Sequence, residues 1–132
     1  MLLVDAANVV GSRPDGWWRD RAGAAGRLVG RLRAAVALGA VAPPVVVMLE
    51  GAARPGAAED DIGGVRVVHA PAEGDDALVA VAANASEGVL VVSADRALGQ
   101  RCREVGADVV GPGWLLDRLE RVIRQSPPDA RL

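Results

Sequence analysis

Short, nearly unbroken apolar runs recur along this chain, and a longer segment of mixed polarity separates each run from the next. Runs of this kind are typical of strands that are buried on both faces of a parallel sheet. They predict strands at 2–5, 45–49, 65–69, 89–93 and 108–110.

The segments between these runs place apolar residues three and four positions apart, which is the spacing of one helix face. In 20–38, for example, Leu28 and Leu32 share a stripe that Arg27 and Arg31 do not join. Helices are predicted at 20–38, from Asp75 or Asp76 to about 85, at 96–104 and at 113–125, and loops at 11–19 and 51–64. Strands that alternate with helices favour a three-layer α/β/α sandwich around a central parallel sheet of about five strands.

The length of 132 residues is that of one ordinary domain, and 51% of the residues are apolar, which is enough for its core. We expect a single domain at 1–125 and a flexible tail at 126–132. One cysteine allows no internal disulfide, which is compatible with a reducing cytosol. The start, MLLVDAANVV, lacks the basic residues of a secretory signal, and no apolar stretch is long enough to span a bilayer. A cytoplasmic protein without a membrane partner is therefore predicted.

The formal net charge is −2, so no overall basic field attracts nucleic acid. The charge is unevenly distributed, however, because residues 13–33 are rich in arginine and residues 59–76 are rich in Asp and Glu. Solvated helix and loop surfaces would also explain both regions. The chain contains no lysine, which excludes reactions that depend on one.

Acidic residues stand where the predicted strands end. Asp5, Glu50 and Asp95 come at or just after the ends of three strands, and Asp75 and Asp76 begin the helix that follows a fourth strand. In an open parallel sheet, sites form beyond the carboxyl ends of the strands, at the point where the strand order reverses. We therefore expect these acids to converge at one edge of the sheet.

Converging carboxylates repel one another and lose hydration, and no lysine is present to neutralise them. They are the hard oxygen ligands that Mg²⁺ or Mn²⁺ prefers, and such an ion activates water and stabilises phosphoryl transfer. Asn8 is placed to hold a metal-bound water or a phosphate oxygen. Taken singly, Asp5, Asp76 or Asp95 is equally a helix N-cap or a turn residue.

The same acids lie in short motifs that resemble those of YacP-like NYN domains, which belong to the PIN-like nuclease superfamily. Residues 4–8, VDAAN, are similar to the D-x-x-N opening of that family, although Ala6 and Ala7 replace its usual glycine-containing middle. Glu50 takes the place of the second acid, at the end of the second strand.

Two further motifs follow in the same order as in the family. Asp76, with Val79 three positions later, resembles the third motif slightly better than Asp75 with Leu78 does. Residues 93–96, SADR, resemble the fourth motif, in which a Ser or Thr and a small residue precede an Asp. The resemblance covers about residues 2–112.

The resemblance implies a sheet ordered 3-2-1-4-5, a divalent-metal site and RNA, single-stranded in our interpretation, as the substrate of a metal-dependent ribonuclease. It implies that Asp5, Asp76 and Asp95 are catalytic and that they bind Mg²⁺ or Mn²⁺ together with Glu50, with Asp75 as a further candidate ligand. Association with the ribosome is an added possibility. The predicted substrate-binding residues are Asn8, Ser93, Arg96, Arg27, Trp17 and Trp18.

Trp17 and Trp18 could stack on unpaired bases beside the arginines of the same loop, or they could cover the core. Arg27 and Arg31 share a helix face, where they could bind phosphates or be solvated. His69 is interpreted as structural, although it ends a strand near the acids.

Other functions stay open or are excluded by single features. A non-catalytic RNA-binding or ribosome-associated module is the main alternative, and a Mg²⁺-dependent nucleotide pyrophosphohydrolase is a distant one. Phosphoaspartyl enzymes normally need a lysine, which this chain lacks, and no glycine-rich nucleotide-binding turn follows the first strand. The oligomeric state stays open between a monomer and a weak homodimer.

Overall fold

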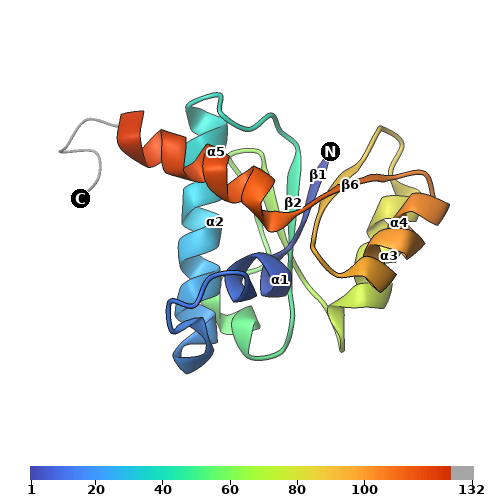
Figure 1. Ribbon diagram of the computed structural model, residues 1–132, viewed down its shortest axis with the longest axis horizontal. Coiled ribbons are helices and arrows are strands. Elements are labelled where there is room, and N and C mark those ends of the chain that lie inside the picture. The colour runs from blue at the N-terminus through green and yellow to red at the C-terminus, as the bar shows by residue number, and fades with distance from the viewer. Residues whose placement is uncertain (126–132) are drawn as a thin grey trace.

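The computed structural model describes residues 1–125, and the predicted tail at 126–132 lies outside the described residues. Five parallel strands form the body of the central sheet: β1 (Leu2–Asp5), β2 (Val45–Leu49), β4 (Val65–His69), β5 (Leu90–Val92) and β6 (Asp108–Val110). Of these, β1, β2 and β6 are labelled in Figure 1. The full order in the sheet is β3-β4-β2-β1-β5-β6. The predicted strands therefore lie in the order 3-2-1-4-5, which confirms the predicted fold.

The sheet has one more strand than the sequence pattern predicts. Residues in the predicted loop at 51–64 form β3 (Asp61–Ile62), which pairs antiparallel with the edge strand β4. Gly63 and Gly64 make the connecting turn with φ values of 61° and 79°, a conformation that favours glycine. A strand of this length shows no alternation of apolar and polar residues, so its sequence cannot indicate it.

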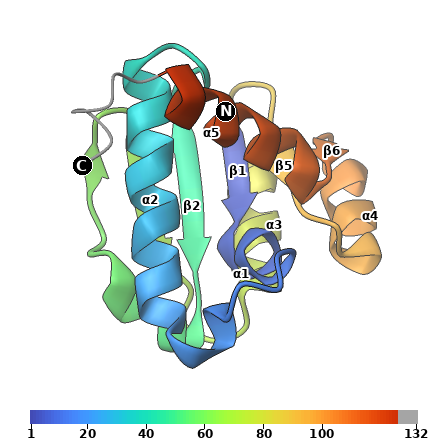
Figure 2. The same cartoon turned by 60° about the vertical axis from the view of Figure 1, so that its left-hand side comes forward.

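Helices cover both faces of the sheet (Figure 2). One face carries α1 (Ala6–Gly11), α2 (Arg21–Ala37) and α5 (Pro112–Gln125), and the other carries α3 (Gly74–Asn84) and α4 (Arg96–Glu104). Two short 3₁₀ helices, η1 (Trp17–Arg19) and η2 (Gly51–Gly56), lie in the connections. Within residues 1–125, none of the helices combines the length and apolarity that a bilayer crossing needs.

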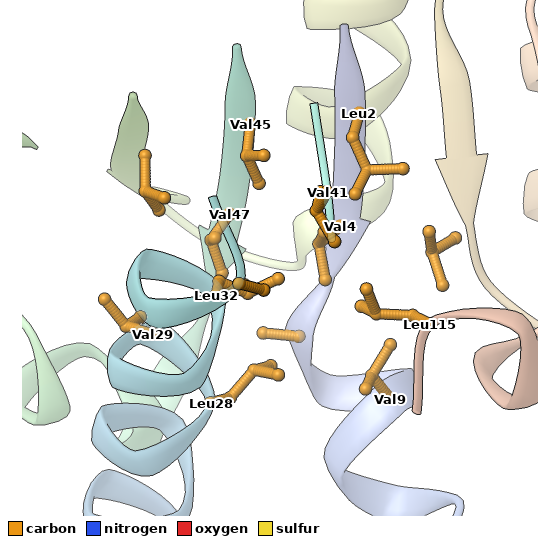
Figure 3. Close-up of a cluster of buried hydrophobic side chains, with 14 of the residues drawn as sticks. Leu2, Val4, Val9, Leu28, Val29, Leu32, Val41, Val45, Val47 and Leu115 are labelled. Carbon is orange, nitrogen blue, oxygen red and sulfur yellow. The ribbon is translucent and has the colours of Figure 1, made fainter. Parts of the chain in front are cut away.

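The alternating directions of strand side chains create two cores. Val45 and Val47 of β2 face α2, whereas Val46 and Met48 face α3 and α4. Figure 3 shows the first core, where α2 side chains such as Leu32 point toward β1 and β2. Burying each Val or Leu contributes about 1.5–3 kcal/mol. Because β1 and β2 are covered on both faces, the acids that follow them start from a fixed backbone.

Candidate active site

Asp5 ends β1 and is the most enclosed acid of the site. Its carboxylate accepts a hydrogen bond from the Ser93 hydroxyl at 2.9 Å and a longer one from the Asn8 backbone N–H at 3.4 Å. Burial raises the pKa of Asp5, and the negative charges of Glu50 and Asp75 raise it further, although the two hydrogen bonds act in the opposite direction. The surroundings of Asp5 in the folded domain therefore disfavour its ionised form.

The ends of β1 and β5 are tied together by short side chains. The buried Ser93 hydroxyl also accepts from the Asp95 backbone N–H at 3.2 Å, and the Asn8 side-chain oxygen accepts from the Ala94 backbone N–H at 2.7 Å. Asp95 caps α4 by accepting from the Leu98 backbone N–H at 3.0 Å. The oxygen atoms of Ser93 and Asn8, which we expected to contact substrate, are engaged within the protein. Their hydrogen bonds link the segments that carry Asp5 and Asp95, and a contact of either residue with substrate stays a prediction.

Glu50 is held by the start of α3. Its Oε2 atom accepts a hydrogen bond from the Gly74 backbone N–H, and the positive end of the helix dipole favours a carboxylate there. A Cβ atom on Gly74 would lie 2.8 Å from Oε2. Glycine at this position therefore lets the acid that follows β2 reach the helix that follows β4.

Asp75 joins the same group of acids. Burial raises the pKa of Asp75, and the charges of Asp95 and Glu50 add to that effect, together with a smaller contribution from Glu73. Arg101 acts in the opposite direction. Asp75 is thus electrostatically coupled to acids that follow β2 and β5, while Asp5 is coupled to Glu50 and Asp75.

Asp76, which the motif comparison favours over Asp75, points away from these acids. Its side chain is 89% exposed and forms an ion pair with Arg101 at 2.8 Å. Consecutive helix residues differ in direction by about 100°, so the two aspartates point in different directions. Leu78, three positions after Asp75, is buried, whereas Val79 is half-buried. In the structure Asp75 and Leu78 therefore meet the description of this motif better than Asp76 and Val79 do, and the catalytic role of either aspartate stays a prediction.

Asp5, Glu50, Asp75 and Asp95 form what we call the acid cluster. Their hard oxygen atoms fit Mg²⁺ or Mn²⁺ chemically, and Mg²⁺ in proteins often takes one or two carboxylates and keeps several waters. Across residues 1–125, no three Asp, Glu, His or Cys side chains stand close enough to form a finished metal site. The donor set fits a divalent ion, and a complete coordination sphere is not preformed.

A cavity of about 490 Å³ opens beside the acid cluster. Its apolar wall is made of small residues from α1, α2, η2 and the loop before α3: Ala6, Ala7, Val10, Ala25, Ala53 and Ala72. Glu50, Glu73 and Asp75 form its acidic side, and Trp17 and Arg21 also line it. We call this space the acid-side cavity.

The two tryptophans of η1 differ in their surroundings. Trp17 lines the acid-side cavity, and the Arg21 guanidinium carbon lies 5.5 Å from its ring centre. Trp18 is 51% exposed and meets Trp17 edge to face, with ring centres 6.2 Å apart and planes at 88°. The structure therefore brings Trp17 to the acids and leaves Trp18 on the outer surface behind it.

Arg27 does not reach the acid-side cavity. Together with Arg31 it lines a second groove of about 270 Å³ between α1, α2 and α5. Arg21, six residues earlier in α2, lines the acid-side cavity instead, and the phosphate contact of Arg27 stays a prediction. Arg96, the first residue of α4, is exposed next to Asp95.

His69 and Cys102 have internal roles. The His69 Nε2 atom lies 2.7 Å from the Ala57 carbonyl oxygen, which fixes the loop after β2 against β4. Cys102 is fully buried, and burial raises the pKa of its thiol. Neither side chain lines the acid-side cavity.

Comparison with known proteins shows the fold. No family model and no curated protein sequence matches this chain. A crystal structure of Rae1 (YacP) from Bacillus subtilis matches it with a TM-score of 0.75 and 19% identity, over 95% of this chain and 76% of that one. This chain has a YacP-like fold. A single-substitution variant of Rae1 gives a TM-score of 0.69 and 20% identity, over 94% of this chain and 76% of the other.

The YacP-like fold agrees with the family that the sequence motifs resemble. Its mostly parallel sheet has helices on both faces, and the acid cluster lies at the carboxyl ends of β1, β2 and β5 and at the start of α3. This is the edge of a parallel sheet at which ligand sites form. The acid cluster therefore lies at the edge of the sheet where a ligand site is expected.

Proposed function

We propose that this protein is a metal-dependent ribonuclease that hydrolyses phosphodiester bonds of single-stranded RNA at the acid cluster. The observation that carries the proposal is Asp5, a largely enclosed carboxylate whose pKa is raised by burial and by the neighbouring charges of Glu50 and Asp75. Perturbed acids in a cleft are characteristic of functional sites.

Helix capping alone does not explain this arrangement. Asp5 caps α1 and Asp95 caps α4, yet Asn or Ser caps a helix about as well and introduces no charge. Asp75 caps no helix and still faces the other acids. A structural role would be served better by neutral side chains, so the repeated choice of carboxylates supports a role for their charge.

The four acids would hold Mg²⁺ or Mn²⁺, which, when bound, activates water and neutralises charge at the phosphate. Ser93 and Asn8 orient the acids through the hydrogen bonds between the ends of β1 and β5. Arg21 at the acid-side cavity and the exposed Arg96 supply positive charge for the flanking phosphates of the RNA.

The YacP-like fold and the order of the motifs both favour RNA as the substrate, because RNA is the usual substrate class of the PIN-like proteins that the motifs resemble. Association with the ribosome would be one way to present single-stranded RNA to the acid cluster. A non-catalytic RNA-binding module is the second candidate, and it is favoured by the caps that Asp5 and Asp95 form and by the incomplete coordination sphere.

The test is cleavage of an end-labelled single-stranded RNA by the pure protein in Mn²⁺, in Mg²⁺ or in EDTA. The Asp5→Asn/Asp95→Asn double variant is the matched control, since asparagine keeps both caps and removes both charges. We expect cleavage that requires metal and is lost in the double variant. Mn²⁺ titration calorimetry gives a second readout, in which the wild type binds and the double variant does not.

Cleavage by the double variant at the wild-type rate would show that the acid cluster takes no part in the reaction. Binding of Mn²⁺ and RNA by a folded wild type that cleaves nothing would favour the non-catalytic module.

A further inference from the structure

The acid-side cavity has a shape and lining that the acid cluster does not require. Its volume of about 490 Å³ falls within the roughly 300–1,000 Å³ of small-molecule sites. One wall consists of alanines and a valine, which leave open the space that larger side chains would fill. Phosphate and metal ions need no apolar wall, so this part of the cavity suits a flat, uncharged group that enters beside the acids.

Two planar groups, Trp17 and Arg21, lie together at the cavity. The Arg21 guanidinium lies over the Trp17 ring, and both line the space. The Trp17 ring packs on Gly11, where a Cβ atom would stand 3.5 Å from the ring, and the edge-to-face contact with Trp18 supports it from outside. Indole and guanidinium planes are the groups on which proteins stack unpaired RNA bases.

The acidic side of the cavity can only accept hydrogen bonds when its side chains are ionised. Glu50, Glu73 and Asp75 are carboxylates, and an ionised carboxylate only accepts hydrogen bonds. Glu73 precedes α3, yet its side chain makes no capping hydrogen bond, and it is exposed at the cavity. Acceptors of this kind pair with exocyclic amino groups of bases, as Glu and Asp do with the amino group of cytosine.

We propose that the acid-side cavity is a pocket for one unpaired nucleobase next to the scissile phosphate. The base stacks on Trp17 and Arg21, and Glu73 selects bases that carry an amino group over uracil. Uracil offers a single N–H between two carbonyl oxygens, which the carboxylates repel. The inference of an RNA base rests on the function proposed above, but the pocket itself binds a base whether or not the protein cleaves RNA.

The experiment follows the three indole N–H signals of the protein by NMR in EDTA, while adenosine, cytidine or uridine is added. Trp17→Phe assigns the Trp17 signal, and Trp114, which stacks on Arg118 at α5, serves as the internal reference. Nucleosides carry no phosphate, so the acid cluster does not repel them. We expect the Trp17 signal to move and saturate, with uridine binding about fivefold more weakly than cytidine, the equivalent of one hydrogen bond.

Two variants separate the pocket from the acids. Ala72→Leu narrows the cavity from an exposed loop position and is expected to weaken cytidine binding about tenfold, the magnitude of a lost stacking contact. Glu73→Gln offers donors as well as acceptors and is expected to bring cytidine and uridine to equal affinity. An unchanged Trp114 signal shows that each variant is folded.

Equal movement of all three indole signals would overturn the proposed base pocket. So would a Trp17 signal that does not move at the highest adenosine concentration reached. Cytidine affinity that Ala72→Leu leaves unchanged would do the same. Because these measurements contain no metal and no cleavage, a base pocket in a protein that cleaves no RNA is distinguished from a nuclease that has no base pocket.

Discussion

The molecule has two hollows with charged linings. Positive and negative side chains are mixed in one, whereas acidic side chains predominate in the other. In the groove between α1, α2 and α5, Arg13 pairs with Glu120 at 2.6 Å, and the arginines Arg27 and Arg31 share the lining with Asp15. In the acid-side cavity, Glu50, Glu73 and Asp75 lie together with only Arg21 among the lining residues to oppose them. Opposite charges on a surface need no function to explain them, whereas gathered like charges destabilise the fold and therefore indicate one.

Asp5→Asn is expected to give the largest effect and to separate activity from stability. Removing a ligand should lower RNA cleavage by at least about a hundredfold, because even changes to the partners of metal ligands lower activity or affinity about 10–100-fold. The same variant should unfold at a higher temperature than the wild type at pH 7 in EDTA, since it removes a buried charge and keeps the α1 cap. Wild-type activity would show that Asp5 takes no part in the reaction. A lower melting temperature would show that the charge of Asp5 does not destabilise the fold.

The stability gain of Asp5→Asn should depend on pH. The folded-state pKa of Asp5 is raised, so its contribution to stability is fully present below the ordinary pKa of 3.8 and is lost as the pH rises through the folded-state value. The difference in the free energy of unfolding between Asp5→Asn and the wild type should therefore grow from pH 3.5 toward pH 7 in EDTA. Urea unfolding across that pH range measures it, and a difference that stays constant would contradict the raised pKa.

Ser93→Ala should give the next largest effect on cleavage. The hydroxyl holds Asp5 and accepts from the Asp95 backbone, so its loss releases both acids and should lower activity about 10–100-fold. Stability should fall by about 1–2 kcal/mol, since a buried hydrogen-bonding group is removed. Ser93→Thr keeps the hydroxyl and should retain most of the activity, which distinguishes positioning of the acids from general disruption.

Gly74→Ala should reduce activity with little effect on stability. The new Cβ atom would stand 2.8 Å from the Glu50 carboxylate, which can swing away at small energetic cost. Alanine also favours the helix over glycine by about 1 kcal/mol, which offsets the strain. We expect about tenfold slower cleavage, the lower limit for disturbing a ligand's partner, with a melting temperature close to that of the wild type. A large fall in the melting temperature at full activity would contradict the contact with Glu50.

The smallest effect compares two arginines of α2 that face different hollows. Arg21→Ala removes a charge at the acid-side cavity and should raise KM for RNA about fivefold, which corresponds to about 1 kcal/mol. Arg27→Ala removes a charge from the second groove and should leave KM unchanged. Equal effects of the two changes would mean that RNA crosses both hollows.

The apolar pattern was sufficient to predict all five parallel strands, because β1 and β2 are buried on both faces and the partly exposed β4 and β6 are still mostly apolar. It was insufficient for β3 and for α1, the helix formed by Ala6–Gly11, since elements this short contain fewer than two repeats of their period. The acids were found from their positions at strand ends. Their neighbours across the sheet, such as Gly74 beside Glu50, depend on contacts between distant segments that no local pattern contains.

The choices that the sequence leaves open in the predicted site have a common physical cause. Choosing between Asp75 and Asp76, or between Arg21 and Arg27, requires knowing which side of a helix faces the site. That direction follows from how α2 and α3 pack on the sheet. In the structure, the burial of Leu78 three residues after Asp75 favours Asp75 as the acid of the third motif. Leu78 and Val79 are both apolar, so the sequence does not show which of them is buried.

The most direct measurement compares RNA cleavage in Mn²⁺ by the wild type, Asp75→Asn and Asp76→Asn. These variants make the same chemical change at adjacent residues, one facing the acid cluster and one paired with Arg101 on the surface. Asp75→Asn is expected to lose at least about a hundredfold in rate, while Asp76→Asn cleaves as the wild type does. Full activity in Asp75→Asn together with loss in Asp76→Asn would contradict the acid cluster as the site of the reaction.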